Sequence, residues 1–159
     1  MKFNKRYIIF GLSATILQIL LSDLLSIKLI RPDFILIFLL YLTIWEGRIA
    51  GISTGFLLGL LVDFIGVASY FGLSALLYTV FTYILGVIHN KYSKWPPILY
   101  HSFWSLCIVL LYFIRFSITS ARLLDYNPQV FWGSVLFSSL YTLAFAIIVL
   151  LFLPLARDS

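Results

Sequence analysis

The chain has 159 residues, of which 62% are hydrophobic and only 11% are charged, and its mean hydropathy is +1.07. Soluble domains carry about 25% charged residues, so this composition excludes a water-soluble fold and makes the lipid bilayer the expected solvent. The net charge of +5 comes from Lys and Arg scattered between apolar runs rather than from a basic stripe, which argues against a nucleic-acid-binding protein.

Apolar runs bounded by charges or turn residues predict an all-α polytopic membrane helical bundle with about six transmembrane helices. We expect these helices to form a single integral membrane domain over residues 1–159. The expected spans are roughly 7–25, 33–46, 48–65, 70–88, 97–116 and 130–154. The second is shorter than the about 20 residues that a full span needs. Pro32 suits its first turn, where a missing N–H is no loss, and Asp33 suits its positive end.

The distribution of Lys and Arg between the expected loops predicts how the chain is oriented. With six spans and a cytoplasmic N-terminus, about seven of the cations fall inside and about four outside, which agrees with the positive-inside rule. Both termini are therefore predicted to be cytoplasmic. Glu46-Gly47-Arg48 becomes a tight inner turn, and residues 116–129 become the longest outer segment, from which Asn127-Pro128 could start the last span. Arg115 is expected to snorkel outward to the interface.

Four residues at intervals of four, Gly51, Gly55, Gly59 and Asp63, form the most distinctive pattern in the sequence. A step of four along a helix turns about 400°, so these positions follow one side of the third span. Small residues at this spacing let another helix approach closely in lipid. We therefore predict that residues 48–65 form the central packing helix, and that Asp63 is a helix-end clamp within reach of Arg31 or of the start of the second span.

Motifs that would indicate chemistry are few. Gly51-Ile52-Ser53-Thr54-Gly55 matches G-x-S-x-G, but that nucleophile motif requires a strand–turn–helix context and here lies in an apolar helix. An intramembrane serine protease using His89 or His101 stays open as a third interpretation. No metal-ligand or nucleotide-binding motif is present, so no catalytic residue, metal or cofactor is predicted.

The order and spacing of several short motifs resemble the rod shape-determining protein MreD family. The resemblance is carried, within residues 31–86, by Arg31-Pro32-Asp33, Glu46-Gly47-Arg48, Gly51, Gly55-Phe56, Gly59-Leu60-Leu61, Asp63, Gly72-Leu73-Ser74-Ala75 and Gly86. It implies a fold similar to the S-component, the substrate-binding subunit, of energy-coupling-factor transporters. It also implies a non-enzymatic scaffold subunit of the bacterial cell-elongation and peptidoglycan-synthesis machinery, located in the bacterial inner membrane.

The partners that this resemblance implies are a membrane-anchored, single-span MreC-like protein and, directly or indirectly, a RodA-type glycosyltransferase and its penicillin-binding transpeptidase. An MreB-type filament would be linked indirectly. The residues expected to serve as structural or partner-contact positions are Arg31, Pro32, Asp33, Gly47, Gly51, Gly55, Phe56, Gly59, Asp63 and Gly72.

The main alternative function is a substrate-binding subunit of a small-molecule, vitamin-type transporter. Such a subunit needs an outward-facing pocket of convergent polar side chains. The residues that could contribute to it are Gln18, Ser22, Asp23, Arg31 and Asp63.

Overall fold

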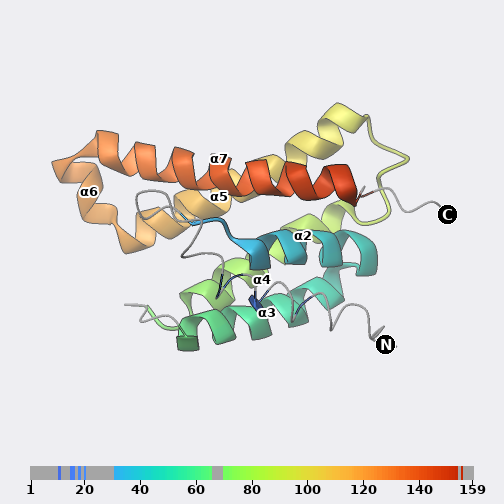
Figure 1. The fold of residues 1–159 in the computed structure, drawn as a ribbon, viewed down its shortest axis with the longest axis horizontal. Helices are drawn as coiled ribbons and strands as arrows, with labels where there is room; N and C mark the ends of the chain where they lie inside the picture. The colour runs from blue at the N-terminus through green and yellow to red at the C-terminus, as the bar shows by residue number, and fades with distance from the viewer. Residues whose placement is uncertain are drawn as a thin grey trace.

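The computed structural model describes residues 31–65 and 70–153, together with residues 11, 15, 16, 18, 20 and 155. All regular structure in this part of the chain is helical, which confirms the predicted all-α bundle (Figure 1). The elements are α2 (Phe34–Glu46), α3 (Arg48–Ile65), α4 (Leu73–Leu85), the 3-10 turn η1 (Gly86–Ile88), α5 (Pro97–Thr119), α6 (Ala121–Tyr126) and α7 (Pro128–Phe152). Among them, α3, α5 and α7 are long and apolar enough to cross a membrane. The first expected span, 7–25, lies mostly outside the described residues.

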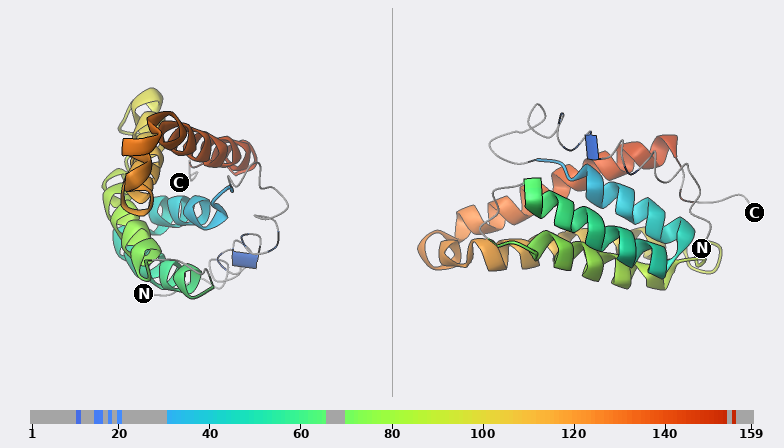
Figure 2. Two further views of the ribbon diagram at one scale, coloured as in Figure 1. Left: turned by 90° about the vertical axis from the view of Figure 1, so that its left-hand side faces the viewer. Right: turned by 90° about the horizontal axis from the view of Figure 1, so that it is seen from below.

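Helix α2 lies at the centre of the bundle. Viewed end-on in the left panel of Figure 2, α3, α4, α5 and α7 form an arc around it. Nine of its 13 residues are buried. A helix that is apolar on every side belongs inside a bundle, because it has no polar face to turn elsewhere. The prediction that α3 is the central helix is therefore wrong: α3 buries only one stripe and exposes the opposite face.

The glycine stripe of α3 makes the close helix contact that its spacing predicts. A Cβ atom at Gly59 would overlap the backbone of Ala75 on α4, and one at Gly51 would overlap the side chain of Thr43 on α2. At Gly55, a Cβ would lie 3.1 Å from the carbonyl oxygen of Tyr78. The prediction of a small-residue seam is confirmed. The seam packs against two neighbouring helices, α2 and α4.

Two glycines with a positive φ mark the turns around α3 and α4. Gly47 has φ +91° and donates its N–H to the carbonyl of Thr43 at 3.0 Å, so α2 ends there and the chain reverses directly into α3. Gly72 also has φ +91° and stands immediately before α4. Any other residue would be strained at either position. The tight turn expected at Glu46-Gly47-Arg48 is confirmed.

The expected start of the last span holds, whereas the expectations for Pro32 and for residues 116–129 do not. Asn127 caps α7 and Pro128 is its first residue, as the sequence predicts. Pro32 instead precedes the cap of α2, so its expected place in the first turn is wrong. The segment 116–129 is not one loop: α5 continues to Thr119 and α6 follows. The physical reason is that no Gly or Pro interrupts residues 98–127, so helical hydrogen bonding can continue.

The seam generates a stability prediction. Gly59→Ala should lower the unfolding midpoint in mild detergent, because overpacking against the Ala75 backbone costs about 1–3 kcal/mol. The control is Gly133→Ala on α7, where the nearest atom to an added Cβ, in Phe137, is 4.0 Å away. Its midpoint should be unchanged or slightly raised, since Ala is the better helix former. Equal midpoints for the two variants would contradict the close approach.

Candidate functional site

Asp63 connects the end of α3 to the start of α4. Its side chain is 4% exposed, and its carboxylate accepts hydrogen bonds from the backbone N–H groups of Gly72 (2.9 Å), Ser74 (3.1 Å) and Ala75 (3.3 Å). These are donors that a helix start leaves without a partner, at the positive end of its dipole. The predicted helix-end contact is confirmed. Its predicted partner is wrong, because the carboxylate binds the start of α4 rather than Arg31 or the start of α2.

Asp33 occupies the matching position at the start of α2. One carboxylate oxygen accepts the N–H of Leu36 at 2.9 Å, which makes Asp33 the N-cap of the helix, as its place at the positive end predicts. The other oxygen accepts the hydroxyl of Tyr78, on α4, at 2.5 Å. Both oxygens of this buried carboxylate are therefore engaged, and the second bond ties α2 to α4.

Two further polar side chains link α5 and α7 to this point. The hydroxyl oxygen of Thr142, on α7, accepts the backbone N–H of Asp33 at 3.4 Å and lies 2.7 Å from the hydroxyl of Tyr112, on α5. Thr142 is fully buried and Tyr112 is 4% exposed. Unpaired polar groups are costly in an apolar interior. These hydrogen bonds therefore determine how α5 and α7 lie against the start of α2.

Arg115 stands one turn beyond Tyr112 on α5 and is half-buried. Tyr78, Asp33, Tyr112 and Asp63 form its electrostatic surroundings. The prediction that Arg115 snorkels outward to the interface stays a prediction. We call Asp33, Tyr78, Tyr112, Arg115 and Thr142 the polar cluster.

The other candidate residues do not converge on the polar cluster. Arg31 is exposed ahead of the buried Pro32. Phe56 lies on the exposed side of α3 and is 49% exposed. Gly47 turns the chain at the opposite end of α2. The ten predicted positions therefore divide between helix starts, turns, a packing seam and an exposed surface, and do not form one site.

The serine motif on α3 does not assemble with a histidine. The hydroxyl of Ser53 donates to carbonyls of its own helix, those of Ile49 and Ala50. The His89 ring is 2.8 Å from the carbonyl of Ile44, and His101 accepts the indole N–H of Trp104. The arrangement that a serine protease needs is therefore not formed. Within the described ranges, no three His, Cys, Asp or Glu side chains are grouped to hold a metal ion.

The residues proposed for a transporter pocket are also engaged elsewhere. Gln18 accepts the backbone N–H of Phe34 at 2.8 Å, and Asp63 caps α4. Positions 22 and 23 lie outside the described residues. At Gln18 and Asp63, the polar side chains that suggested this pocket therefore serve to bind backbone N–H groups at helix starts.

Sequence reasoning missed Tyr78, Tyr112 and Thr142 because no motif distinguishes them from the other Ser, Thr and Tyr residues of the apolar spans. A signal was nevertheless available. A bilayer offers no water to a hydroxyl in its hydrocarbon region, so a hydroxyl in a spanning helix indicates a partner in its own helix or on another. That signal identifies the residues but does not say which of them pair.

Long apolar helices around a buried central helix, with internal polar groups bonded across helices, define a polytopic membrane protein of the helical-bundle class. The model of one protein family, the rod shape-determining protein MreD, matches residues 3–156. Because the match covers nearly the whole chain, the chain belongs to this family of rod-shape-determining membrane proteins. No solved structure matches it.

The capping contact generates a second prediction. Asp63→Ala should lower the free energy of unfolding by about 1–3 kcal/mol, because buried N–H groups at the start of α4 lose their acceptor. Asp63→Asn, which keeps one acceptor oxygen, should lose less. Denaturant titration in detergent micelles measures both. Asp125→Ala on the exposed helix α6 is the control, and a loss in Asp63→Ala no larger than in this control would contradict the assignment.

The polar cluster generates a third testable prediction, which concerns stability. Tyr78→Phe removes the hydroxyl that binds Asp33 and leaves a buried carboxylate oxygen without that donor, at an expected cost of about 1–3 kcal/mol. Tyr83→Phe is the matched control, because Tyr83 lies on the same helix but is 54% exposed. Thermal unfolding followed by circular dichroism should separate the two. Identical midpoints would show that the Tyr78 bond carries no net stability.

Proposed function

We propose that this chain is a non-enzymatic scaffold subunit of the bacterial cell-elongation machinery, acting as one integral membrane domain in the bacterial inner membrane. The observation that carries the proposal is the family match over residues 3–156. Both termini are proposed to be cytoplasmic, which the bias of Lys and Arg between the loops supports. The polar cluster then lies toward the outer side and Gly47 toward the cytoplasm.

The chemistry of the described residues supports a scaffold. Asp33 and Asp63 are occupied as helix caps, and Ser53 is bonded within its own helix. General acid–base or nucleophilic catalysis needs such groups to face a substrate and one another. What the bundle presents instead is apolar helix surface suited to contacts with other helices.

We propose that the exposed face of α3 receives the transmembrane helix of an MreC-like single-span protein. This face consists of Ile49, Phe56, Leu57 and Phe64, which are 74%, 49%, 65% and 74% exposed. The opposite side of α3 packs against α2 and α4 along the glycine seam. Because association in lipid depends on van der Waals packing between helix surfaces, a bulky face that none of the described helices α2 to α7 covers suits this role. A RodA-type glycosyltransferase, a penicillin-binding transpeptidase and an MreB-type filament would join directly or through this partner.

Gentle purification from native membrane, followed by mass analysis of the proteins and small molecules retained, tests the proposal. The wild-type chain should retain a single-span protein. A Phe56→Ala/Leu57→Ala double variant should bind it at least tenfold more weakly, equivalent to about 1.4 kcal/mol. The matched control is Leu136→Ala/Phe137→Ala on α7, where the side chains are 52% and 63% exposed, and it should retain the partner.

Each other outcome has a defined meaning. Loss of the partner in the α7 variant alone would move the contact away from α3. Retention of a vitamin-sized molecule with no single-span protein would contradict the scaffold and favour the transporter subunit. Substrate turnover that Ser53→Ala abolishes would contradict a non-enzymatic role.

A further inference from the structure

The outer helices of the bundle differ in length. In the arc seen end-on in the left panel of Figure 2, α3 and α4 lie at one end and α7 lies at the other. Helix α3 has 18 residues and α7 has 25. The 13 residues of α4 and the three of η1 that continue it extend roughly 24 Å, at 1.5 Å per residue. The α4 edge of the bundle is therefore the shortest part of the arc.

The outer side of α4 is apolar along its length. Its exposed side chains are Leu76, Val80, Tyr83 and Val87, which are 57%, 43%, 54% and 38% exposed and repeat at intervals of three and four residues. This spacing makes one continuous stripe along the helix. The polar residues 89–91 follow η1 directly and end the stripe. A bilayer therefore has to cover about 24 Å of apolar helix at this edge.

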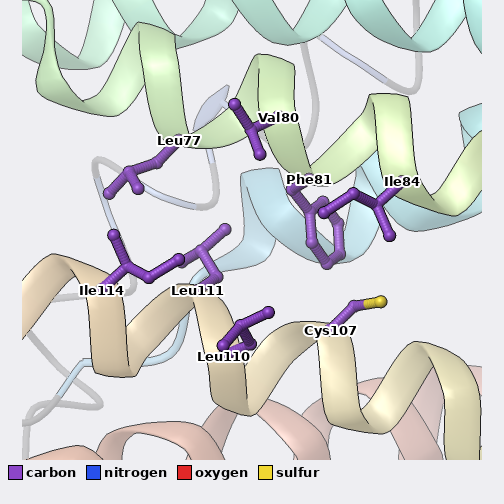
Figure 3. A pocket seen from close by; sticks show the side chains of 8 residues that line it. All are labelled: Leu77, Val80, Phe81, Ile84, Cys107, Leu110, Leu111 and Ile114. Carbon is purple, nitrogen blue, oxygen red and sulfur yellow. The ribbon is translucent and has the colours of Figure 1, made fainter.

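The outer surface between α4 and α5 is nearly closed. Figure 3 shows the shallow crevice there, with Val80 from α4 and Leu110 from α5 among its lining side chains. Phe81 and Leu111, which are 3% and 4% exposed, close it on the inside. The enclosed space is about 20 Å³, room for about one water molecule. Lipid therefore meets α4 and α5 as one continuous face, without entering between them.

The outer side of α7 is longer than that of α4 by roughly 9 Å. Its exposed apolar side chains extend from Val130 to Phe152, roughly 33 Å, and those of α5 extend from Ile98 to Ile118, roughly 30 Å. The hydrocarbon layer of a bilayer is about 30 Å thick, which suits α5 and α7 and exceeds α4.

Helix tilt does not remove this difference, because tilt shortens the projection of every helix. With α4 upright, α7 would have to tilt about 43° to span the same thickness, and more if α4 is tilted as well. Spanning helices tilt by about 0–40°. The two edges therefore require hydrocarbon layers of different thickness.

We propose that the α4 edge of the bundle thins the bilayer beside it and preferentially binds phospholipids with short acyl chains, whereas the α7 edge meets a bilayer of full thickness. Thinning of the bilayer accommodates a helix that is shorter than the hydrocarbon layer, at a cost that grows with the mismatch. Shorter acyl chains fill the thinner layer and lower this cost. The inference concerns lipid contacts, so it does not depend on the scaffold function.

Quenching of tryptophan fluorescence by brominated phosphatidylcholine tests the proposal, with the full chain reconstituted in vesicles. Trp132, which is 49% exposed, is first replaced by Phe, because the other three tryptophans are half-buried or buried. A probe is then introduced as Tyr83→Trp on α4 or as Phe137→Trp on α7. These positions are a matched pair, since both hold exposed aromatic residues, 54% and 63% exposed. Both also lie roughly 4 Å along the axis from the middle of their helix.

At each probe, brominated lipid competes with phosphatidylcholines whose hydrocarbon layers are about 24 Å or about 33 Å thick, the lengths of the two edges. At Tyr83→Trp, the short-chain lipid should bind at least about twofold more tightly than the long-chain lipid, and at Phe137→Trp the order should reverse. Val80→Trp supplies a second reading on α4 that does not depend on the folding of Tyr83→Trp. The unmodified chain supplies a second reading on α7 through Trp132.

Three results would overturn the proposal. The same preferred chain length at both probes would show that lipid meets one hydrophobic thickness around the bundle. A long-chain preference at Tyr83→Trp would show that the bilayer beside α4 is not thinned. Absence of quenching at Tyr83→Trp, with normal quenching at Phe137→Trp, would show that a second copy of the chain rather than lipid covers α4.

Discussion

The close approach of α3 to α4 is the contact on which the rest of the bundle depends. At Gly59 the two backbones are so near that a single methyl group would overlap Ala75, and just beyond it the Asp63 carboxylate binds the N–H groups that start α4. Packing and capping therefore act at the same place. The seam brings the helices together, and the carboxylate determines where along α3 the next helix begins. With this pair in place, α2 can lie between it and the α5–α7 pair.

The second constraint is that a hydrocarbon solvent leaves internal polar groups only one another as partners. The polar cluster meets this constraint by joining four helices through Asp33, whose carboxylate reaches α4 and whose N–H reaches α7. Tyr112 extends the connection to α5 through Thr142. Hydrogen bonds are directional, so they can select one rotation of each helix. Apolar contacts alone, which are similar on several sides of α2, would select it less sharply.

These constraints also separate the roles of the surface and the interior in this membrane protein. The carboxylates of Asp33 and Asp63 and the hydroxyls of the polar cluster hold helices together, and bulky apolar side chains on α3 are exposed. Arg115 lies near these groups, with Asp33 and Asp63 in its electrostatic surroundings.

Local features were determined by the sequence itself. The glycine spacing of α3, the turn at Gly47 and the cap at Asn127 each depend on residues within a few positions of one another, and each agrees with the structure. The polar cluster was not accessible in this way. Tyr78 lies 45 residues from Asp33, and Tyr112 lies 30 from Thr142. Whether such residues meet depends on how each helix is rotated and which helix takes the centre. Many apolar sequences satisfy the same periodicity, so only the packing of α2 inside the arc decided these pairings.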